Sequence, residues 1–208
     1  MKRYKINEIF YSLQGEGRNA GRAAVFVRFS GCNLACWFCD TDHREGVFMT
    51  ADEIVGRVEE YPRGLLVLTG GEPSLFIDEE LTGRFKAMGF EVAIETNGTR
   101  PLPGNIDWVT LSPKSSSGFD SDSDSDSDFG SGVGTELVLD KCEELKVVFP
   151  CDKLSAYDAI GAKYRYLQPC DTGNEAKNKE ITEMCVEYVK NNPQWRISLQ
   201  LHKILSIR

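Results

Sequence analysis

One segment of the chain decides the predicted fold: residues 23–39 read AAVFVRFSGCNLACWFC. The first seven residues form a short run of mainly apolar β-branched and aromatic side chains, which is typical of a buried strand. A serine and a glycine follow, and then three cysteines, Cys32, Cys36 and Cys39. Because ligands bind at the carboxyl ends of parallel strands, this segment predicts a strand that carries a thiol-rich site at its end.

Similar strands recur along the chain, separated by turns and amphipathic stretches. We expect strands over residues 23–29, 65–69, 91–95, 108–111, 145–149, 164–167 and 196–201. We expect helices over 50–60, 78–88, 154–160 and 179–191, the first opened by a capping box from Thr50 to Glu53. The alternation predicts a parallel sheet, with residues 4–11 as a strand outside the repeat. Several links are too short for a full helix, so we expect an incomplete TIM-like βα barrel with fewer than eight βα units.

Length and charge restrict the class of protein. The 208 residues predict a single domain, and 24 Lys+Arg against 32 Asp+Glu give a formal net charge of −8. Five of the aspartates lie in a Ser/Asp/Gly-rich stretch, 115–134, which is too polar to bury a core and is expected to be a mobile insertion. A calcium- or phosphate-sensing arm is the alternative, but the EF-hand ligand spacing is missing.

The partners and the compartment follow from what the sequence lacks. There is no long Lys/Arg cluster, which argues against sequence-independent nucleic-acid binding. The apolar runs are far shorter than the ~20 residues of a membrane helix, and no apolar signal-peptide stretch follows the start. We therefore expect a cytoplasmic protein without nucleic-acid or membrane partners. Its seven cysteines are an odd number, and in that compartment they do not predict a disulfide framework.

The cysteine triplet leaves two interpretations open. A structural zinc site takes four ligands, and His43 is a candidate for the fourth. A 4Fe-4S cluster is normally held by four thiolates, so three thiolates would leave one iron free to bind a small molecule. The amino and carboxylate groups of S-adenosylmethionine (SAM) suit that vacant position.

The Cys-x3-Cys-x2-Cys spacing, together with Thr69-Gly70-Gly71-Glu72-Pro73 after the next strand, resembles the radical SAM superfamily. Within it, the chain is similar nearly end to end to the 7-carboxy-7-deazaguanine synthases of queuosine biosynthesis. The shared motifs are SLQGEG (12–17), VRF (27–29), CDT (39–41), ETNG (95–98), LSPK (111–114), LQP (167–169) and QLHK (200–203).

The resemblance implies a chemistry and a set of cofactors. Enzymes of this family convert 6-carboxy-5,6,7,8-tetrahydropterin to 7-carboxy-7-deazaguanine with loss of ammonia, after a SAM-derived radical removes the hydrogen from C6. It implies a 4Fe-4S cluster, SAM and Mg²⁺, an electron donor such as flavodoxin or ferredoxin, and a homodimer. A glycyl-radical-enzyme activase is the rival within the superfamily, and a non-catalytic zinc or iron-sulfur module is the rival outside it.

The resemblance also implies roles for individual residues. The cluster ligands are Cys32, Cys36 and Cys39, and Thr41 is the magnesium ligand, with Asp40 as a competitor through water. The substrate-binding residues are Leu13, Gln14, Gly15, Glu16, Arg28, Thr69 and His202. Gln14 and Glu16 suit the donor edge of a pterin, Arg28 suits its carboxylate, and His202 is expected to reach that carboxylate from the last strand. The SAM-binding residues are Phe38, Cys39, Asp40, Gly71, Glu72, Ser112, Pro113, Lys114, Gln168, Pro169, Cys170 and Asp171. No residue is expected to act as a catalytic acid or base, because the radical comes from the cofactor.

Overall fold

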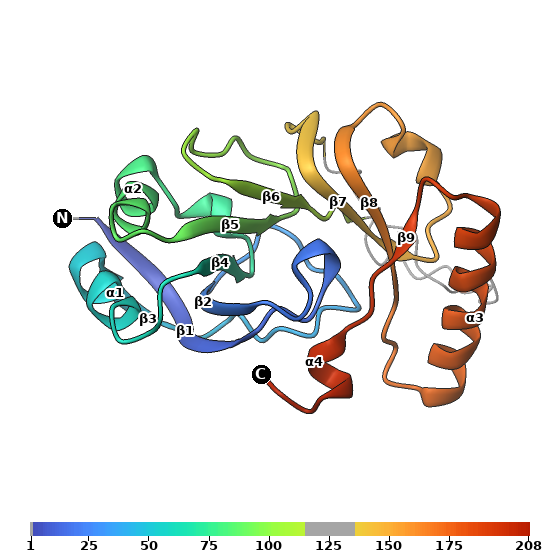
Figure 1. Cartoon of the computed structure of the whole chain (residues 1–208), viewed down its shortest axis with the longest axis horizontal. Helices are drawn as coiled ribbons and strands as arrows, with labels where there is room; N and C mark the ends of the chain where they lie inside the picture. Colours follow the sequence, from blue (N-terminus) through green and yellow to red (C-terminus); the bar gives the residue numbers. More distant parts are fainter. Residues whose placement is uncertain (1, 115–135) are drawn as a thin grey trace, which may run out of the picture.

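The computed structural model describes residues 2–114 and 136–208, and within them nine strands form one curved sheet (Figure 1). The strands are β1 Arg3–Leu13, β2 Ala23–Phe29, β3 Val47–Thr50, β4 Leu65–Gly70, β5 Glu91–Thr96, β6 Trp108–Leu111, β7 Lys141–Phe149, β8 Gly161–Pro169 and β9 Arg196–Ile197. Their order in the sheet is β3-β1-β2-β4-β5-β6-β7-β8-β9. From β2 to β9 all neighbours are parallel, whereas β1 runs antiparallel to both β2 and β3. The sheet does not close, which confirms the incomplete barrel. The predicted Ser/Asp insertion at 115–134 lies outside the described residues.

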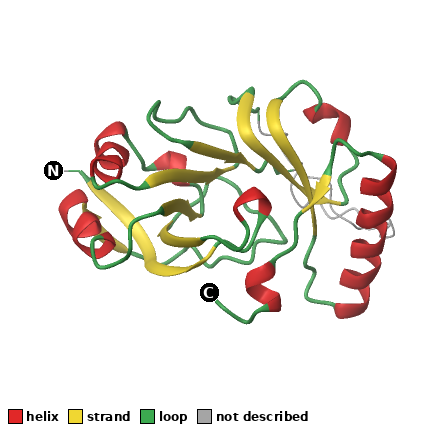
Figure 2. Ribbon diagram, in the orientation of Figure 1, coloured by secondary structure: helices red, strands yellow, loops and turns green. Residues whose placement is uncertain are grey.

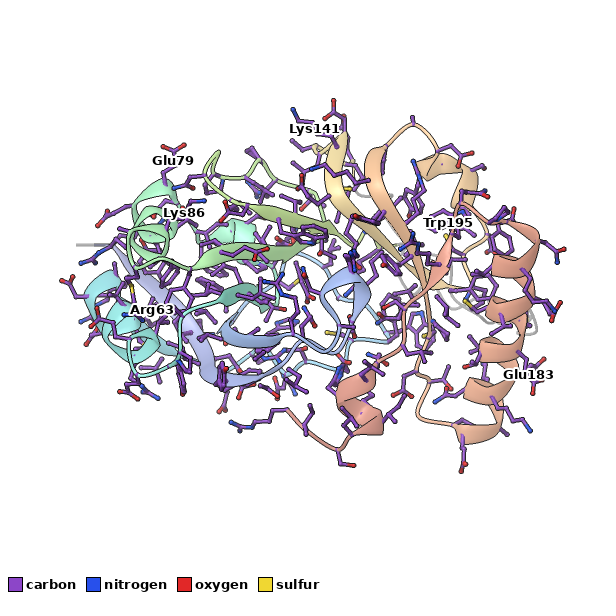
Figure 3. The ribbon with its side chains drawn as sticks, viewed as in Figure 1. Arg63, Glu79, Lys86, Lys141, Glu183 and Trp195 are labelled. Atoms are coloured by element: carbon purple, nitrogen blue, oxygen red, sulfur yellow. The ribbon has the colours of Figure 1, made fainter. Side chains whose placement is uncertain are left out.

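The helices pack beside the sheet (Figure 2). They are α1 Ala51–Val58, α2 Glu79–Ala87, α3 Glu175–Asn191 and α4 Leu201–Ile204, with 3-10 turns at η1 Gly17–Asn19, η2 Pro73–Leu75 and η3 Leu154–Tyr157. The capping box is present: the Thr50 amide donates to Glu53 Oε2 at 2.7 Å, and the Glu53 amide donates to Thr50 Oγ1 at 3.3 Å. On the outside of the helices, Glu79 and Glu183 point away from the body of the molecule (Figure 3). No helix in the described ranges is long and apolar enough to cross a membrane.

The two faces of the sheet differ in chemistry. On β2, Val25, Val27 and Phe29 belong to the aliphatic core shared with α1 and α2. The alternate residues Phe26 and Arg28 point to the inner face, where Phe26 stacks on Phe10 with ring centroids 4.9 Å apart. Because successive side chains of a strand face opposite ways, each strand contributes both to the core and to the inner face.

The last predicted strand is wrong beyond its first two residues. β9 ends at Ile197, and the chain then leaves the sheet and forms the short helix α4, which contains His202. The Leu201 amide donates to the carbonyl of Gly15 at 2.9 Å, so α4 is held by the loop after β1 rather than by β8. His202 was expected on the last strand, but it lies in α4.

Other helices and strands differ from their expected bounds by a few residues. The helix expected over 154–160 is a single 3-10 turn, and the four-residue strand β3 was not predicted. Helix α3 begins at Glu175, four residues before the expected start at 179, because the Asn174 side chain caps it by accepting from the Lys177 amide at 3.1 Å. Strands β7 and β8 also begin earlier than expected, at Lys141 and Gly161.

Candidate active site

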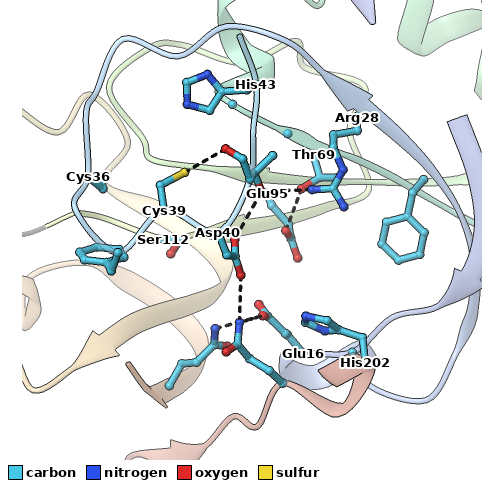
Figure 4. Close-up of a pocket in the computed structure, with 18 of the residues that line it drawn as sticks. Glu16, Arg28, Cys36, Cys39, Asp40, His43, Thr69, Glu95, Ser112 and His202 are labelled. Atoms are coloured by element: carbon cyan, nitrogen blue, oxygen red, sulfur yellow. Dashed lines mark hydrogen bonds between the residues drawn. The ribbon is translucent and has the colours of Figure 1, made fainter. Parts of the chain in front are cut away.

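The inner face opens into a cavity of about 650 Å³ at the carboxyl ends of the parallel strands (Figure 4). The predicted cluster, substrate and SAM residues all line this cavity, with the exception of Pro113. Residues that come from widely separated parts of the sequence therefore meet in one place. The arrangement follows from the parallel order of the strands, because parallel strands end at the same rim.

The three cysteines lie on the loop between β2 and β3. Its two ends are joined where the Gly31 amide donates to the carbonyl of His43 at 2.9 Å, and Asn33 Nδ2 ties it to Thr99 Oγ1 at 2.8 Å. Burial raises the pKa of the Cys32 and Cys36 thiols, and the charge of neighbouring thiols raises it further. A metal or cluster binds the thiolate form.

The donor set fits a 4Fe-4S cluster with one open iron better than a preformed zinc site. Three thiols on one loop line the cavity, and they are the ligand type that such clusters take. Across residues 2–114 and 136–208, no three His, Cys, Asp or Glu side chains already stand where they could hold a single metal ion. His43 is therefore not assembled with the thiols into a zinc site.

The glycine pair at the end of β4 serves the contact with the cysteine loop. A Cβ on Gly71 would lie 2.1 Å from the carbonyl oxygen of Gly31, and Gly70 has a φ of +124° that disfavours other residues. The pair lets the carboxyl ends of β2 and β4 pack directly together.

Glu72 is fully engaged by its own chain. Its carboxylate accepts from Thr96 Oγ1 and the Asn97 amide, both at 2.7 Å, and from the Ser74 amide at 3.0 Å. Only 1% of the residue is exposed. Glu72 therefore connects the ends of β4 and β5, in addition to lining the cavity.

Glu16 lies at the centre of a polar network. Its carboxylate pairs with Lys146 of β7 and accepts from Gln168 Nε2 at 3.0 Å and from Gln200 Nε2 at 3.1 Å. Burial alone would raise the pKa of Glu16, but the charge and hydrogen bond of Lys146 and the bond from Gln200 bring it down to about 2. The carboxylate is therefore ionised at neutral pH.

Glu95 of β5 connects the other polar side chains of the inner face. It accepts from Gln14 Nε2 at 3.1 Å and from Thr69 Oγ1 at 3.0 Å, and Lys146 Nζ lies 3.6 Å away. Lys146 thus stands between two carboxylates, Glu16 and Glu95. Figure 4 shows Glu95 with Thr69 and Arg28 on one side of the cavity, and Glu16 with His202 on another.

Arg28 and Thr41 are brought together at the rim. Arg28 Nη1 donates to Thr41 Oγ1 at 3.3 Å, while Arg28 Nε pairs with Glu8 at 3.0 Å and the guanidinium lies 5.6 Å from the Phe10 ring centroid. Asp40 accepts from the Thr41 hydroxyl at 3.3 Å. The predicted carboxylate-binding and magnesium-binding residues are thus neighbours.

His202 reaches the cavity from α4. A Cβ on Gly15 would lie 2.2 Å from His202 Nδ1, so the ring packs directly on the glycine of the loop after β1. The predicted position on a strand was wrong, but the side chain lines the same cavity as the other substrate residues.

The residues predicted for SAM fall into two groups. Lys114 Nζ donates to Ser112 Oγ at 2.8 Å beside the cysteine loop, and burial together with the charge of Lys146 lowers the pKa of Lys114. In contrast, the side chain of Gln168 bonds to Glu16 and to Ser198, which places it with the predicted substrate residues. Cys170 contributes a backbone bond, its amide donating to the carbonyl of Phe149 at 2.9 Å.

Helix α4 connects two walls of the cavity. Lys203 Nζ lies 2.6 Å from Asp171 and 3.4 Å from Asp40, which belong to the loop after β8 and to the cysteine loop. Hydrogen bonds from Lys203, the Gly173 amide and Asn178 lower the pKa of Asp171 to about 2. Asp171 is thus held by the chain's own donors.

Three further residues line the cavity without having been predicted as site residues: Lys146, Glu95 and Gln200. For Lys146 a signal existed: a lysine in the middle of a run of residues expected to be a buried strand. A buried lysine requires a partner. The sequence alone does not identify that partner, because Glu16 is 130 residues away.

Comparisons with known proteins agree with this geometry. Residues 26–149 match the profile of the Radical SAM superfamily. The chain is similar to the 7-carboxy-7-deazaguanine synthase of Bacteroides thetaiotaomicron, with 48% identity over 204 residues and 98% of both chains covered. It is 40% identical to that of Burkholderia multivorans over 228 residues, covering 98% of this chain and 99% of the other. The crystal structure of QueE from Escherichia coli superposes with a TM-score of 0.71 at 26% identity, covering 96% of this chain and 95% of that one.

Proposed function

Because the chain belongs to the 7-carboxy-7-deazaguanine synthase family of the radical SAM superfamily, we propose that its cavity holds 6-carboxy-5,6,7,8-tetrahydropterin beside SAM. The enzyme converts this substrate to 7-carboxy-7-deazaguanine, with loss of ammonia, in queuosine biosynthesis. The observation that carries the proposal is that the three thiols and the polar side chains of the inner face line one cavity.

The cofactor side of the cavity is built on the cysteine loop. Cys32, Cys36 and Cys39 are the proposed ligands of the 4Fe-4S cluster, and three thiolates would leave one iron available for SAM. When bound, these cofactors supply the radical that removes a hydrogen atom from the substrate. The proposed SAM residues are Phe38, Cys39, Asp40, Gly71, Glu72, Ser112, Pro113, Lys114, Gln168, Pro169, Cys170 and Asp171. The task of the chain is to position the reacting atoms and to exclude water.

The substrate side uses the inner face and the loop after β1. Glu16, held as a carboxylate, accepts from the adjacent donors of the pterin edge, and the Gln14 amide supplies a neighbouring acceptor or donor. Arg28 offers two parallel N–H donors for the substrate carboxylate, and His202 supplies a further donor. Thr69 is proposed to donate its hydroxyl, and Leu13 and Gly15 contribute backbone.

We further propose a magnesium ion at Thr41. Mg²⁺ binds through few protein oxygens and keeps substrate oxygens and waters as its other ligands, so one hydroxyl with Asp40 nearby is a sufficient anchor. The neighbouring Arg28 brings the substrate carboxylate to the same point. Replacing Thr41→Ala should weaken the response of turnover to added Mg²⁺ while the iron content stays the same; an unchanged response would remove Thr41 as a ligand.

The direct test of the function is turnover under reducing, anaerobic conditions. Protein loaded with iron and sulfide is incubated with reductant, SAM, Mg²⁺ and the carboxypterin, and the deazapurine acid is measured by mass. We expect the acid and free ammonia in equal amounts. SAM cleavage without the acid would point back to another radical SAM activity, such as a glycyl-radical-enzyme activase, which the relatives do not favour. A zinc-loaded protein without SAM cleavage would select a binding module.

The remaining parts of the proposal concern partners and compartment. A low-potential electron donor, such as flavodoxin or ferredoxin, is proposed to reduce the cluster. The cytoplasm is the proposed compartment, because an odd number of cysteines, three of them in one compact set, does not predict a disulfide framework. A homodimer is proposed from the resemblance, and sedimentation of the loaded enzyme measures it.

A further inference from the structure

Lys146 is a buried cation on the inner face of β7, and the proposed reaction gives it no role. Only 7% of its side chain is exposed. Lysines almost never lie this deep without a partner. Its neighbours on the same strand, Leu145 and Val147, belong to a second hydrophobic core, which also contains Ile181 of α3. A hydrophobic residue at 146 would avoid the cost of burying a charge. We therefore look for the role of this cation in its interactions with neighbouring side chains.

The surroundings of Lys146 are the proposed substrate residues. It pairs with Glu16 and lies 3.6 Å from Glu95. Glu95 in turn accepts from Gln14 and from Thr69. Through these two carboxylates, Lys146 is connected to three of the side chains that are proposed to contact the pterin. Removing a nearby cation raises the pKa of a buried carboxylate, and the protonated form is a different hydrogen-bonding group.

Charged groups approach Lys146 from several elements. Glu16 comes from the loop after β1, Glu95 from β5 and Glu144 from β7 itself, and all three favour the protonated lysine. Lys114, after β6, repels it, and His202 of α4 interacts with Glu16. Burial raises the pKa of Glu144, which has the Arg18 amide as its donor at 2.8 Å. Lys146 is thus the cation on which the ionised form of Glu16 chiefly depends.

We propose that Lys146 is a positioning residue, which fixes Glu16 and Glu95 as oriented carboxylates so that Glu16, Gln14 and Thr69 present a preset hydrogen-bonding surface to the pterin. Lys146 does not touch the reacting atoms in this account. The proposal rests on the proposed function, since it concerns binding of that substrate.

The test is Lys146→Met, which keeps the length of the side chain and removes the charge. Its control is Lys163→Met, which removes a lysine from the neighbouring strand β8 where the side chain is 68% exposed and pairs with Glu143 outside the cavity. For Lys146→Met we expect KM for the carboxypterin to rise roughly tenfold or more, because Glu16 is no longer held as an ionised acceptor for the paired donors of the pterin edge. We expect kcat at saturation to change much less, and Lys163→Met to behave like the wild type.

The pH profile supplies a readout that a merely structural role would not move. In the wild type the pKa of Glu16 is about 2, so Glu16 adds no pH dependence to KM between about pH 6 and pH 8. Without Lys146, burial is opposed only by the smaller effects of Gln200 and His202, and the pKa of Glu16 rises. The ratio of KM for Lys146→Met to KM for the wild type should then increase as the pH falls through that range, since a protonated carboxyl presents a donor where the N–H groups of the pterin need an acceptor. The ratio cancels any pH dependence that the two enzymes share. For Lys146→Arg, which keeps the charge, the same ratio should stay constant.

A double variant tests whether Lys146 acts through Glu16. Glu16→Gln is neutral and needs no cation, so Lys146→Met should add little to the KM defect of Glu16→Gln. This comparison also covers a poor fold of Lys146→Met, because the double variant no longer buries the carboxylate that pairs most closely with Lys146. Full additivity, or an unchanged KM in a folded, iron-loaded Lys146→Met, would overturn the role of Lys146. A wild type that cleaves SAM but leaves the carboxypterin unchanged would overturn the proposed substrate, and this inference with it.

Discussion

The outer face of the sheet buries aliphatic and aromatic side chains beneath helices, whereas the inner face places charged and polar side chains around a cavity, although both come from the same strands. On β7, Leu145 and Val147 face the core, whereas Lys146 lines the cavity and Glu144 accepts from the Arg18 amide at 2.8 Å. On β4, Leu68 is in the core and Thr69 bonds to Glu95 at the cavity.

This difference shows how a small chain carries both stability and chemistry. The alternation of a strand has a period of two, so one strand supplies the core with every second residue and the site with the others. A shift of the strand by one residue would exchange the two sets. The core therefore fixes the register that places the site, and substitutions on the two faces should have separable effects.

The largest effect is expected on turnover, from the inner face and the loop beside it. Glu16→Ala and Arg28→Ala each remove a charged partner of the substrate, and kcat/KM should fall by about 100-fold or more with the iron content unchanged. The matched control is Arg22→Ala, since Arg22 pairs with Glu91 at 2.6 Å on an exposed surface. Normal turnover by both cavity variants would show that the substrate assignment is wrong.

The adjacent residues Leu68 and Thr69 separate the two faces most sharply. Leu68 is fully buried in the outer core, so Leu68→Ala should cost about 2–5 kcal/mol of stability. For a chain of this size that is a fall in melting temperature of about 5–15 °C. Thr69→Ala should lower the melting temperature much less and weaken turnover instead. An equal fall in melting temperature in the two variants would contradict the separation of core residues and site residues between the two faces.

The glycine pair at the end of β4 lets this strand pack closely against the cysteine loop. Gly71→Ala sets a Cβ against the Gly31 carbonyl, which has no flexible side chain to move aside, so β4 and the cysteine loop must separate. We expect a lower iron content and a stability loss of roughly 1–3 kcal/mol. Gly56→Ala is the control: it lies in α1 with open space around the added Cβ, and should stabilise by about 0.5–1 kcal/mol. A Gly71→Ala protein with full iron content would rule out this close contact as a requirement.

The smallest effect is expected at the exposed bridge between α4 and the loop after β8. Asp171→Asn removes the ion pair with Lys203, which should lower stability by about 0.2–1 kcal/mol. The folded pKa of Asp171 is lowered from 3.8 to about 2, so the contribution is present above about pH 4 and is lost only as the pH falls toward 2. The melting-temperature difference from wild type should therefore be constant between pH 5 and pH 8. A difference that varied over this range would assign the effect to another group.

Local sequence patterns were sufficient for the main strands and for the cofactor loop. β2 has the predicted bounds, and the cysteine triplet lies at its carboxyl end, because an apolar strand and a compact set of thiols are both local signals. The capping box at Thr50 is equally local. The incomplete barrel followed from the short links between strands.

The parts that were not predicted depend on contacts distant in the sequence. α4 replaces the end of the last strand because its first amide bonds to Gly15, nearly the whole chain away. In the sequence, Lys146 is a single charged residue in an apolar strand, and only the fold brings Glu16 and Glu95 beside it. Such long-range polar pairs leave no periodic pattern in the sequence.

The most direct test of the central claim follows the hydrogen at C6 of the substrate. The carboxypterin carrying deuterium at C6 is incubated with the reduced, iron-loaded enzyme, SAM and Mg²⁺, and the adenosyl products, SAM and the deazapurine acid are analysed by mass spectrometry. We expect that deuterium leaves C6 and is recovered in the 5′ position of the adenosyl group as the deazapurine acid forms. Deuterium that stays in the pterin while SAM is cleaved would contradict the claim that this cavity presents the carboxypterin to the radical.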